Sequence, residues 1–391
     1  MNYILFDGTV RNALLPFTYT RPVAEIRIGI LTIREKWERY LGSTTTTITE
    51  DYLTDKFPMV ELEKNVMINA SYLPDQTLVD QIKNLKEYEA ICIADEIVAF
   101  YSLDSQEEVD FSIYTMIPYE GEILQIRNTW DIFSKNKEAI IADFTLITKD
   151  RKSSPISDTN TVFCPENIFI EEGAVVECSI LNAKNGPIYI GKNAEVMEGS
   201  IIRGGFALGE QAIVKMGAKI YGATTVGPHS KVGGEVNNAV IFGYSNKGHD
   251  GFLGNSVLGE WCNIGADTNT SNLKNNYAPV RLWNYETENF AKTGLQFCGL
   301  MMGDHSKCGI NMMFNTGTVV GVSANIFGSG FPRNFIPAFS WGGAAGFSTY
   351  LPKKAFETAN AMMERRGMLF DEKEEAILNH IFEETKKWRK D

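Results

Sequence analysis

The sequence predicts an α/β domain, a parallel β-solenoid and a helical tail, in that order. Apolar strands alternate with helical segments before residue 150, aliphatic residues recur at every sixth position in the middle, and helical spacing returns near the end. We place the α/β domain at 1–150, a polar linker at 151–165, the solenoid at 166–345, and a cap with C-terminal helices at 346–391. A chain of 391 residues is long enough for two or three such units.

The α/β domain begins with an apolar strand at 3–6 that a turn follows. Helical spacing predicts one amphipathic helix over 24–41 and another over 75–85. Residues 65–69 are typical of a buried strand, and 88–100 are typical of a strand pair. Because strands alternate with helices, we expect a parallel sheet whose ligand binds at the loop after the first strand.

The middle of the chain repeats every six residues. No helix has this period, whereas a solenoid turns a corner every six residues and stacks its corner side chains into an internal column. The frame breaks between residues 238 and 302, and breaks in a repeat are where function tends to lie. The corner residues are Ile190, Val196, Ile202, Leu208, Val214, Ile220, Val226 and Val232, then Met302, Cys308, Phe314, Val320 and Ile326.

Composition and charge argue against several classes of partner and cofactor. The formal net charge is -12 and no long basic patch occurs, so we expect no nucleic-acid partner. Six scattered cysteines without CxxC spacing favour reduced thiols over disulfides or zinc, and we predict no metal ligands. The chain has no basic-then-apolar leader and no apolar run long enough for a bilayer, so we expect a cytoplasmic protein without a membrane partner.

The segments 4–11 (ILFDGTVR) and 15–22 (LPFTYTRP) resemble the opening of sugar-1-phosphate nucleotidyltransferases. The resemblance implies that Gly8, Thr9 and Arg11 bind a nucleotide, since backbone N–H groups and a guanidinium stabilise phosphate charge. It also implies Mg²⁺ as a cofactor of an active domain. The chain departs from the family pattern in three places: it has one loop glycine, it lacks a lysine after Arg21-Pro22, and it has Ser71 where the family has a magnesium-binding aspartate.

Two interpretations of this domain stay open. It is either a divergent active nucleotidyltransferase or a domain that keeps the fold and binds sugar or nucleotide without chemistry, and we favour the second. The sequence does not distinguish UTP from dTTP as the nucleotide.

The six-residue repeat resembles the left-handed parallel β-helix of hexapeptide-repeat transferases. The resemblance implies a homotrimer with sites in grooves between neighbouring helices. The break at 243–272 is more specific, because its motifs resemble the acetyltransferase half of the bifunctional bacterial enzymes that acetylate glucosamine-1-phosphate and then uridylylate it. The motifs are Lys247-x-Gly-His249, Leu258-Gly259, Asn263-Ile-Gly-Ala266 and Asn272.

This second resemblance implies roles for individual residues. His249 would be the general base that deprotonates an acceptor attacking acetyl-CoA, because an imidazole suits this role near neutral pH, and Asn272 would assist it. Departures at Asn237, Phe252 and Leu273 remove groups with which the family holds the sugar phosphate, so we expect another acceptor. The implied substrate-binding residues are Glu235, Lys219, Lys247, Phe252 and Asn263, and the implied coenzyme-binding residues are Ala266 and Gly328.

Two further segments stand outside the repeat. The excursion 273–297 is either a lining of the site, with Trp283 or Tyr285 stacking on a ligand, or a surface hairpin. Residues 353–390 are helical in spacing and divided at Gly367, and the apolar residues before them should cap the open end of the solenoid.

The sequence therefore predicts a transferase. Its function would be acyl-CoA-dependent acetyl transfer to a sugar phosphate or nucleotide sugar, joined to a nucleotidyltransferase-like domain. The alternatives are a non-catalytic sugar-nucleotide-binding or scaffolding trimer, and an enzyme with nucleotidyl transfer alone.

Overall fold

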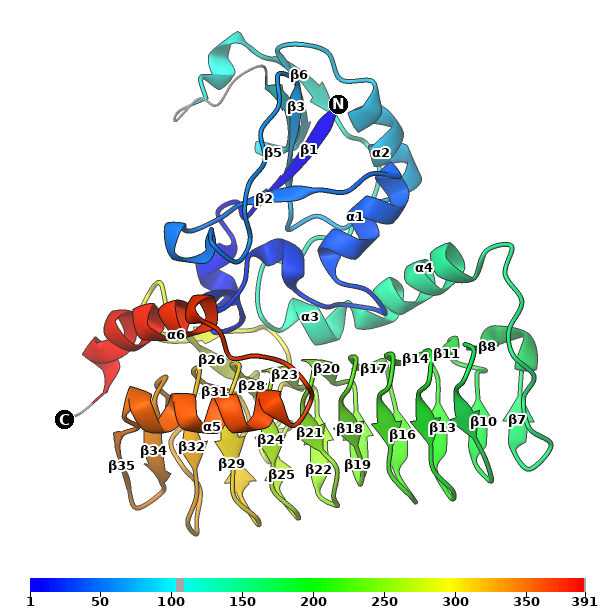
Figure 1. The fold of residues 1–391 in the computed structure, drawn as a ribbon, viewed down its shortest axis with the longest axis vertical. Coiled ribbons are helices and arrows are strands. Elements are labelled where there is room, and N and C mark those ends of the chain that lie inside the picture. Colours follow the sequence, from blue (N-terminus) through cyan, green and yellow to red (C-terminus); the bar gives the residue numbers. More distant parts are fainter. Residues whose placement is uncertain (103–108, 390–391) are drawn as a thin grey trace. The chain divides into compact units, whose positions relative to one another are not determined.

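The computed structural model describes residues 1–102 and 109–389 (Figure 1). The chain forms two compact units, and two short segments near the N-terminus are grouped with the second. Unit 1 contains Met1–Leu14, Thr20–Ile26 and Leu31–Asn128, and unit 2 contains Leu15–Tyr19, Arg27–Ile30 and the chain from Thr129 onward. The predicted order of α/β domain, parallel β-helix and helical tail is confirmed.

Unit 1 is built on a mixed six-stranded sheet with the order β2-β1-β3-β5-β4-β6. The expected all-parallel sheet is wrong, because β5 runs antiparallel to both β3 and β4. The reason is the short turn at Ala94 and Asp95, which is too short for the crossover that parallel strands require. The strands are β1 (Asn2–Phe6), β2 (Thr46–Ile48), β3 (Asn65–Asn69), β4 (Glu89–Ile93), β5 (Glu96–Ser102) and β6 (Thr115–Pro118).

Two helices belong to unit 1, α1 (Ile33–Leu41) and α2 (Gln76–Lys83). The predicted helix over 24–41 is too long. Gly29 has a φ of 73°, which interrupts a helix, and Thr32 then starts α1 through a reciprocal capping box with Glu35. The second predicted helix is confirmed, with Asp75 as its N-cap.

Unit 2 contains a parallel β-solenoid of about 10 turns, whose strands stack in three sheets (Figure 1). Sheet one contains β7 (Thr161–Phe163), β10 (Ile180–Asn182), β13 (Ile201–Arg203), β16 (Lys219–Tyr221), β19 (Glu235–Asn237) and β22 (Phe252–Gly254). Sheet two contains β8 (Ile168–Ile170), β11 (Ile188–Ile190), β14 (Phe206–Leu208), β17 (Thr224–Val226), β20 (Val240–Gly243), β23 (Val257–Glu260), β28 (Leu300–Met302), β31 (Thr318–Val320) and β33 (Phe335–Ile336).

Sheet three completes the walls of the solenoid and ends in the one antiparallel pair of its strands, β34 with β35. It contains β9 (Val175–Val176), β12 (Glu195–Val196), β15 (Ile213–Val214), β18 (Lys231–Val232), β21 (Asn246–Lys247), β24 (Asn263–Ile264), β29 (Lys307–Cys308), β32 (Asn325–Ile326), β34 (Ser340–Gly343) and β35 (Gly346–Thr349). A further parallel pair consists of β25 (Asn269–Thr270) and β30 (Met313–Phe314), and β25 lies next to β22 in the solenoid.

The predicted internal column is confirmed. Each of the thirteen corner residues of the sequence repeat is at most 4 % exposed and lies in one apolar cluster that runs through the solenoid. Burying one such aliphatic side chain contributes about 1.5–3 kcal/mol to folding. The column therefore stabilises every coil in turn.

The break in the repeat is narrower than predicted. Paired residues lie 18 positions apart from the pair Ile188–Phe206 to the pair Ile213–Lys231, but Thr225 pairs with Val240 and Glu235 pairs with Phe252. Shorter coils shift the six-residue frame, so the solenoid continues through residue 272 although the pattern is lost. The true excursion carries the antiparallel hairpin of β26 (Arg281–Asn284) and β27 (Asn289–Lys292), which confirms the hairpin alternative.

The start of the solenoid also differs from the prediction, because β7 already lies inside the predicted linker. At the other end, β33 and β34 follow Ile326 and lie within the predicted bounds of 166–345. Helices α3 (Asp131–Ser134) and α4 (Asn136–Thr148) are grouped with unit 2 and lie along the solenoid (Figure 1). The Asn136 side chain fixes α4 there by donating to the Ala223 carbonyl and the Thr225 hydroxyl, each at 3.1 Å.

The helical tail is confirmed as α5 (Pro352–Glu364) and α6 (Glu372–Glu384), with Gly367 between them, although Lys390 lies outside the described residues. Phe339 packs against Phe382 at the end of the solenoid, as expected of a cap. None of the helices that the structure describes combines the length and the apolarity needed to cross a bilayer.

Candidate active site on the solenoid

The predicted base His249 lies at a corner between β21 and β22, where its side chain is exposed. This corner is held from inside the solenoid. The Lys247 ammonium donates to the carbonyl oxygen of His249 and, at 3.3 Å, to that of Asp250. The exposed imidazole thus sits on a backbone segment whose carbonyls are bound by a buried cation.

Lys247 itself is only 2 % exposed and takes the place in the internal column that Val232 has one coil earlier. Burial lowers its pKa to about 8, while the nearby carboxylates of Asp250 and Asp267 oppose that shift. The predicted substrate-binding role does not fit this placement, because the ammonium faces the interior. Lys247 supports the corner from beneath.

Three predicted substrate-binding residues form one row on the outer face of sheet one. Lys219 pairs with Glu235, and Glu235 pairs with Phe252, so the three side chains lie on successive coils. Paired strands are about 4.8 Å apart, which places these groups within reach of one small molecule. Glu235 also accepts a hydrogen bond from the Tyr221 hydroxyl at 2.6 Å, and this bond raises the pKa of Tyr221 to about 12.

Asn272 reaches the same face from the next coil. Its amide donates to the Asn255 side-chain oxygen at 2.8 Å. Sequence reasoning missed Asn255, although Asn238, Asn255 and Asn272 recur at the spacing of the short coils. A test for this longer period would have found the series.

Asn263, Ala266 and Gly328 lie on the sheet-three side of the His249 corner. Asn263 accepts from the Asn246 amide at 3.2 Å. Ala266 takes the corner position of the next coil, and its carbonyl accepts from the N–H of Asn311 at 2.8 Å. Backbone bonds continue this corner toward Gly328, so the two predicted coenzyme residues share one edge of the solenoid with His249.

In the predicted nucleotide loop of unit 1, the arginine is bound by other side chains of the same unit. Gly8 has a φ of 63°, and a Cβ there would lie 3.0 Å from the Asn69 side chain, so the turn requires glycine. Arg11 is only 7 % exposed and donates to Glu50 at 3.2 Å and to the Tyr52 hydroxyl at 2.8 Å. The guanidinium predicted to hold a phosphate is thus engaged with protein groups, while Thr9 is exposed.

The residues at the expected magnesium position do not fit that ion. Ser71 is fully buried and its hydroxyl accepts from Gln125 at 3.0 Å. Glu96 accepts from Tyr72 at 2.9 Å and from Arg127 at 2.6 Å, so its charge is already balanced. Across residues 1–102 and 109–389, no three His, Cys, Asp or Glu side chains come together as a metal site would require.

Comparison with known proteins identifies the class to which each half is similar. Residues 3–152 match a family model described as sugar nucleotidyl transferase, while the solenoid and its corner carry the acetyltransferase motifs. The resemblance to bifunctional nucleotidyltransferase/acetyltransferases is confirmed.

Particular relatives agree with this class. The chain is 28% identical over 214 residues to the bifunctional sugar-1-phosphate nucleotidylyltransferase/acetyltransferase of Sulfurisphaera tokodaii, covering 54% of this chain and 46% of that protein. It is 33% identical over 87 residues to the bifunctional protein GlmU of Methanocaldococcus jannaschii, covering 22% of this chain and 21% of that protein. The matches thus span less than half the length of these curated relatives.

Two solved structures match the chain at low sequence identity. The UDP-N-acetylglucosamine acyltransferase of Campylobacter jejuni matches with 14% identity and a TM-score of 0.30, covering 61% of this chain and 92% of that one. The polySia specific acetyltransferase NeuO matches with 16% identity and a TM-score of 0.26, covering 49% of this chain and 87% of that one. No functional conclusion follows from likenesses of this size.

Proposed function

We propose that the protein transfers an acyl group from acyl-CoA, with acetyl as the expected group, to a sugar phosphate or nucleotide sugar. The observation that carries the proposal is the position of His249, exposed at a corner that leads directly into the row of Lys219, Glu235 and Phe252. The bifunctional relatives support the same class of reaction.

The chemistry assigned to the site is a single transfer. The acceptor's amine or hydroxyl attacks the thioester carbonyl carbon, His249 takes the proton that this group releases, and the C–S bond breaks. The coenzyme thiolate then leaves and is protonated. In this proposal Asn272 positions the acceptor, the edge with Asn263, Ala266 and Gly328 receives the coenzyme, and a homotrimer provides the neighbouring wall of each groove.

The test is coenzyme-thiol release, screened over amino sugars, their phosphates and nucleotide sugars. We expect His249→Ala to lower kcat at least about 100-fold, the usual contribution of a general base. The matched control is His380→Ala, because His380 is an exposed histidine on α6. Equal turnover in wild type and His249→Ala would remove the proposed role of His249.

The second candidate function is nucleotidyl transfer, which the family model over residues 3–152 favours. We propose that unit 1 binds a sugar nucleotide without this chemistry, because Arg11 is engaged and Ser71 replaces a magnesium ligand. The test is to supply a nucleoside triphosphate, a sugar-1-phosphate and Mg²⁺ and to measure pyrophosphate. Release of pyrophosphate would show that unit 1 transfers a nucleotidyl group. UTP and dTTP should both be supplied.

A further inference from the structure

A pocket of about 520 Å³ lies within unit 2, where α3 and α4, a corner of the solenoid and the end of the 273–297 excursion come together. Its volume is in the usual range for small-molecule sites. It adjoins the acceptor row and contains none of that row's residues. Its charged side chains are Lys137, Glu138 and Arg203, and its polar side chains are Ser134, Asn185, Tyr221, Asn238, Asn255 and Gln296.

The cations of this pocket point to an anionic ligand. Lys137 and Arg203 are both exposed, and within the described parts of the chain neither side chain is in an ion pair or a hydrogen bond. Glu138 is the single acid of the lining, so the pocket carries an excess of positive charge in a protein whose net charge is -12. A phosphate accepts several charge-assisted hydrogen bonds from such a pair.

The remaining lining suits a sugar. Phe297 is 46 % exposed at the pocket, so its ring can cover the C–H face of a sugar ring. Asn238 and Asn255 present amides of the kind that bind hydroxyl groups.

Hydrogen bonds connect the pocket with Glu235 of the acceptor row and with Asn272. Tyr221 lines the pocket and donates to Glu235, and Asn255 lines it and accepts from Asn272. His249 precedes β22 and Asn255 follows it, so the base and the pocket lie at opposite ends of this strand. The cations lie farther from His249, because β13, which ends at Arg203, is three coils away from β22. At about 4.8 Å per coil this adds about 14 Å, which is more than one sugar phosphate spans.

We propose that this pocket binds the phosphate of a phosphorylated sugar, with Lys137 and Arg203 as the residues that select for phosphate. That the ligand is a sugar rests on the proposed acyl transfer. The pocket is a separate binding site from the reacting site at His249.

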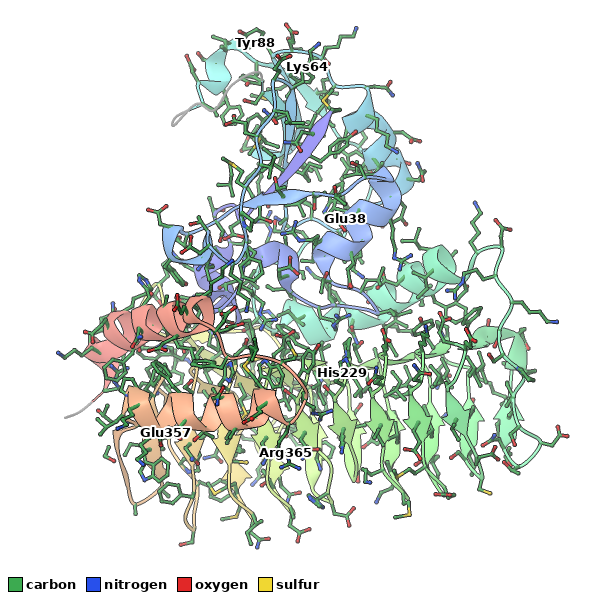
Figure 2. All side chains as sticks on the ribbon, in the orientation of Figure 1. Glu38, Lys64, Tyr88, His229, Glu357 and Arg365 are labelled. Atoms are coloured by element: carbon green, nitrogen blue, oxygen red, sulfur yellow. The ribbon has the colours of Figure 1, made fainter. Side chains whose placement is uncertain are left out.

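The experiment is isothermal titration of the full chain with a neutral amino sugar, its 1-phosphate and the matching nucleotide sugar. We expect Lys137→Gln/Arg203→Gln to bind both phosphorylated ligands at least about tenfold more weakly and the neutral sugar unchanged. Glu138→Gln should bind them more tightly, because it removes the one repelling charge. The control Lys192→Gln/Arg365→Gln removes the same charge from residues outside the pocket, Arg365 being the C-cap of α5 (Figure 2).

Equal loss of phosphate binding in both double variants, or binding that the Lys137 and Arg203 changes leave unaltered, would overturn the pocket assignment. So would a wild-type protein that binds no phosphorylated sugar. Tighter binding of the nucleotide sugar than of the 1-phosphate would identify the nucleotide sugar as the preferred ligand of the pocket. Phosphate-dependent binding without any thiol release would retain the pocket and reject the acyl transfer, so the two proposals fail separately.

Discussion

At the scale of single residues, the buried Lys247 is the least expected part of the site. An ammonium inside an aliphatic column is costly, and its lowered pKa of about 8 reflects that cost. What the residue supplies is two hydrogen bonds to the backbone beneath His249. The buried Lys247 therefore lowers the stability of the fold, and it holds the His249 corner in place.

Replacing Lys247 by methionine separates those two effects. We expect Lys247→Met to keep or raise Tm, because an apolar side chain replaces a buried charge, and to lower kcat about tenfold, because the His249 corner loses its support. Calorimetry and thiol-release kinetics on the same preparation measure both.

The pH dependence provides the control for that variant. The folded pKa of Lys247 is about 8 and the unfolded value is about 10.4, so the unfolded chain binds more protons between these values. Stability should therefore gain from Lys247 as pH rises from about 8 to 10.4 in the wild type, and this gain should vanish in Lys247→Met. A variant whose Tm and kcat fall together would contradict the assignment.

The sequence predicted the motif around His249 but not the direction of Lys247. Neighbouring strand residues point to opposite faces, so a shift of one residue in the coil decides whether Asn246 or Lys247 enters the core. The shortened coils produce that shift, and the six-residue pattern of the sequence does not indicate it. The contacts of Arg11 could not be predicted for a related reason, since its partner Glu50 is distant in sequence and only the folded chain brings them together.

At the scale of elements, the hairpin of β26 and β27 belongs to the packing of the solenoid end. Trp283 stacks on Phe335 at 4.1 Å, and Tyr285 contacts Phe335 and Trp388. Neither ring is available to stack on a ligand, although the sequence left that alternative open. The same excursion still contributes Phe297 to the proposed phosphate pocket.

Tyr285 offers a test of this packing role. Its ring is 6 % exposed, and its hydroxyl is buried without a hydrogen-bond partner among the described residues. We expect Tyr285→Phe to leave Tm unchanged or raise it, and Tyr285→Ala to destabilise by about 3–5 kcal/mol. Thermal unfolding monitored by circular dichroism measures both changes. Weaker sugar binding in Tyr285→Phe would contradict the packing role and assign the hydroxyl to a ligand.

The sequence predicted the solenoid coils correctly where side chains repeat every six residues, and it did not predict them where the length of the repeat changes. Column residues such as Ile202 and Val214 are buried as expected, since they recur at fixed spacing. His229, which Figure 2 labels, and His305 have positive φ angles, and they stack with Tyr244 and Trp261 in one ladder of rings. The ladder itself could not be predicted, because its members also depend on the short coils.

At the scale of the whole molecule, the chain passes into unit 2 early and then leaves it. Residues 27–30 are grouped with the solenoid, where the Gly29 carbonyl accepts from Thr225 at 2.7 Å and the Gly29 N–H donates to Asn136 at 2.7 Å. A Cβ on Gly29 would lie 2.4 Å from Asp143 and 2.8 Å from the backbone of Ala139. The position therefore has no room for any other residue.

We expect Gly29→Ala to lower the Tm of the solenoid transition by more than about 5 °C, because the backbone of α4 cannot move aside cheaply. Scanning calorimetry of the full chain would resolve it. Gly42→Ala is the matched control: Gly42 also has a positive φ, of 70°, but a Cβ there meets nothing within 4 Å. Equal losses in both variants would mean that the backbone angle alone, and not the contact, matters.

The early segment also sets an order of events during synthesis. Gly29 and Thr225 are 196 residues apart, and Arg27 and its acceptor Phe242 are 215 apart. At about 5–20 residues per second, a ribosome needs roughly 10–40 s to make the later partner after the earlier one has emerged. Residues 27–30 must therefore wait, unpaired and within reach of chaperones, until several solenoid coils exist to receive them.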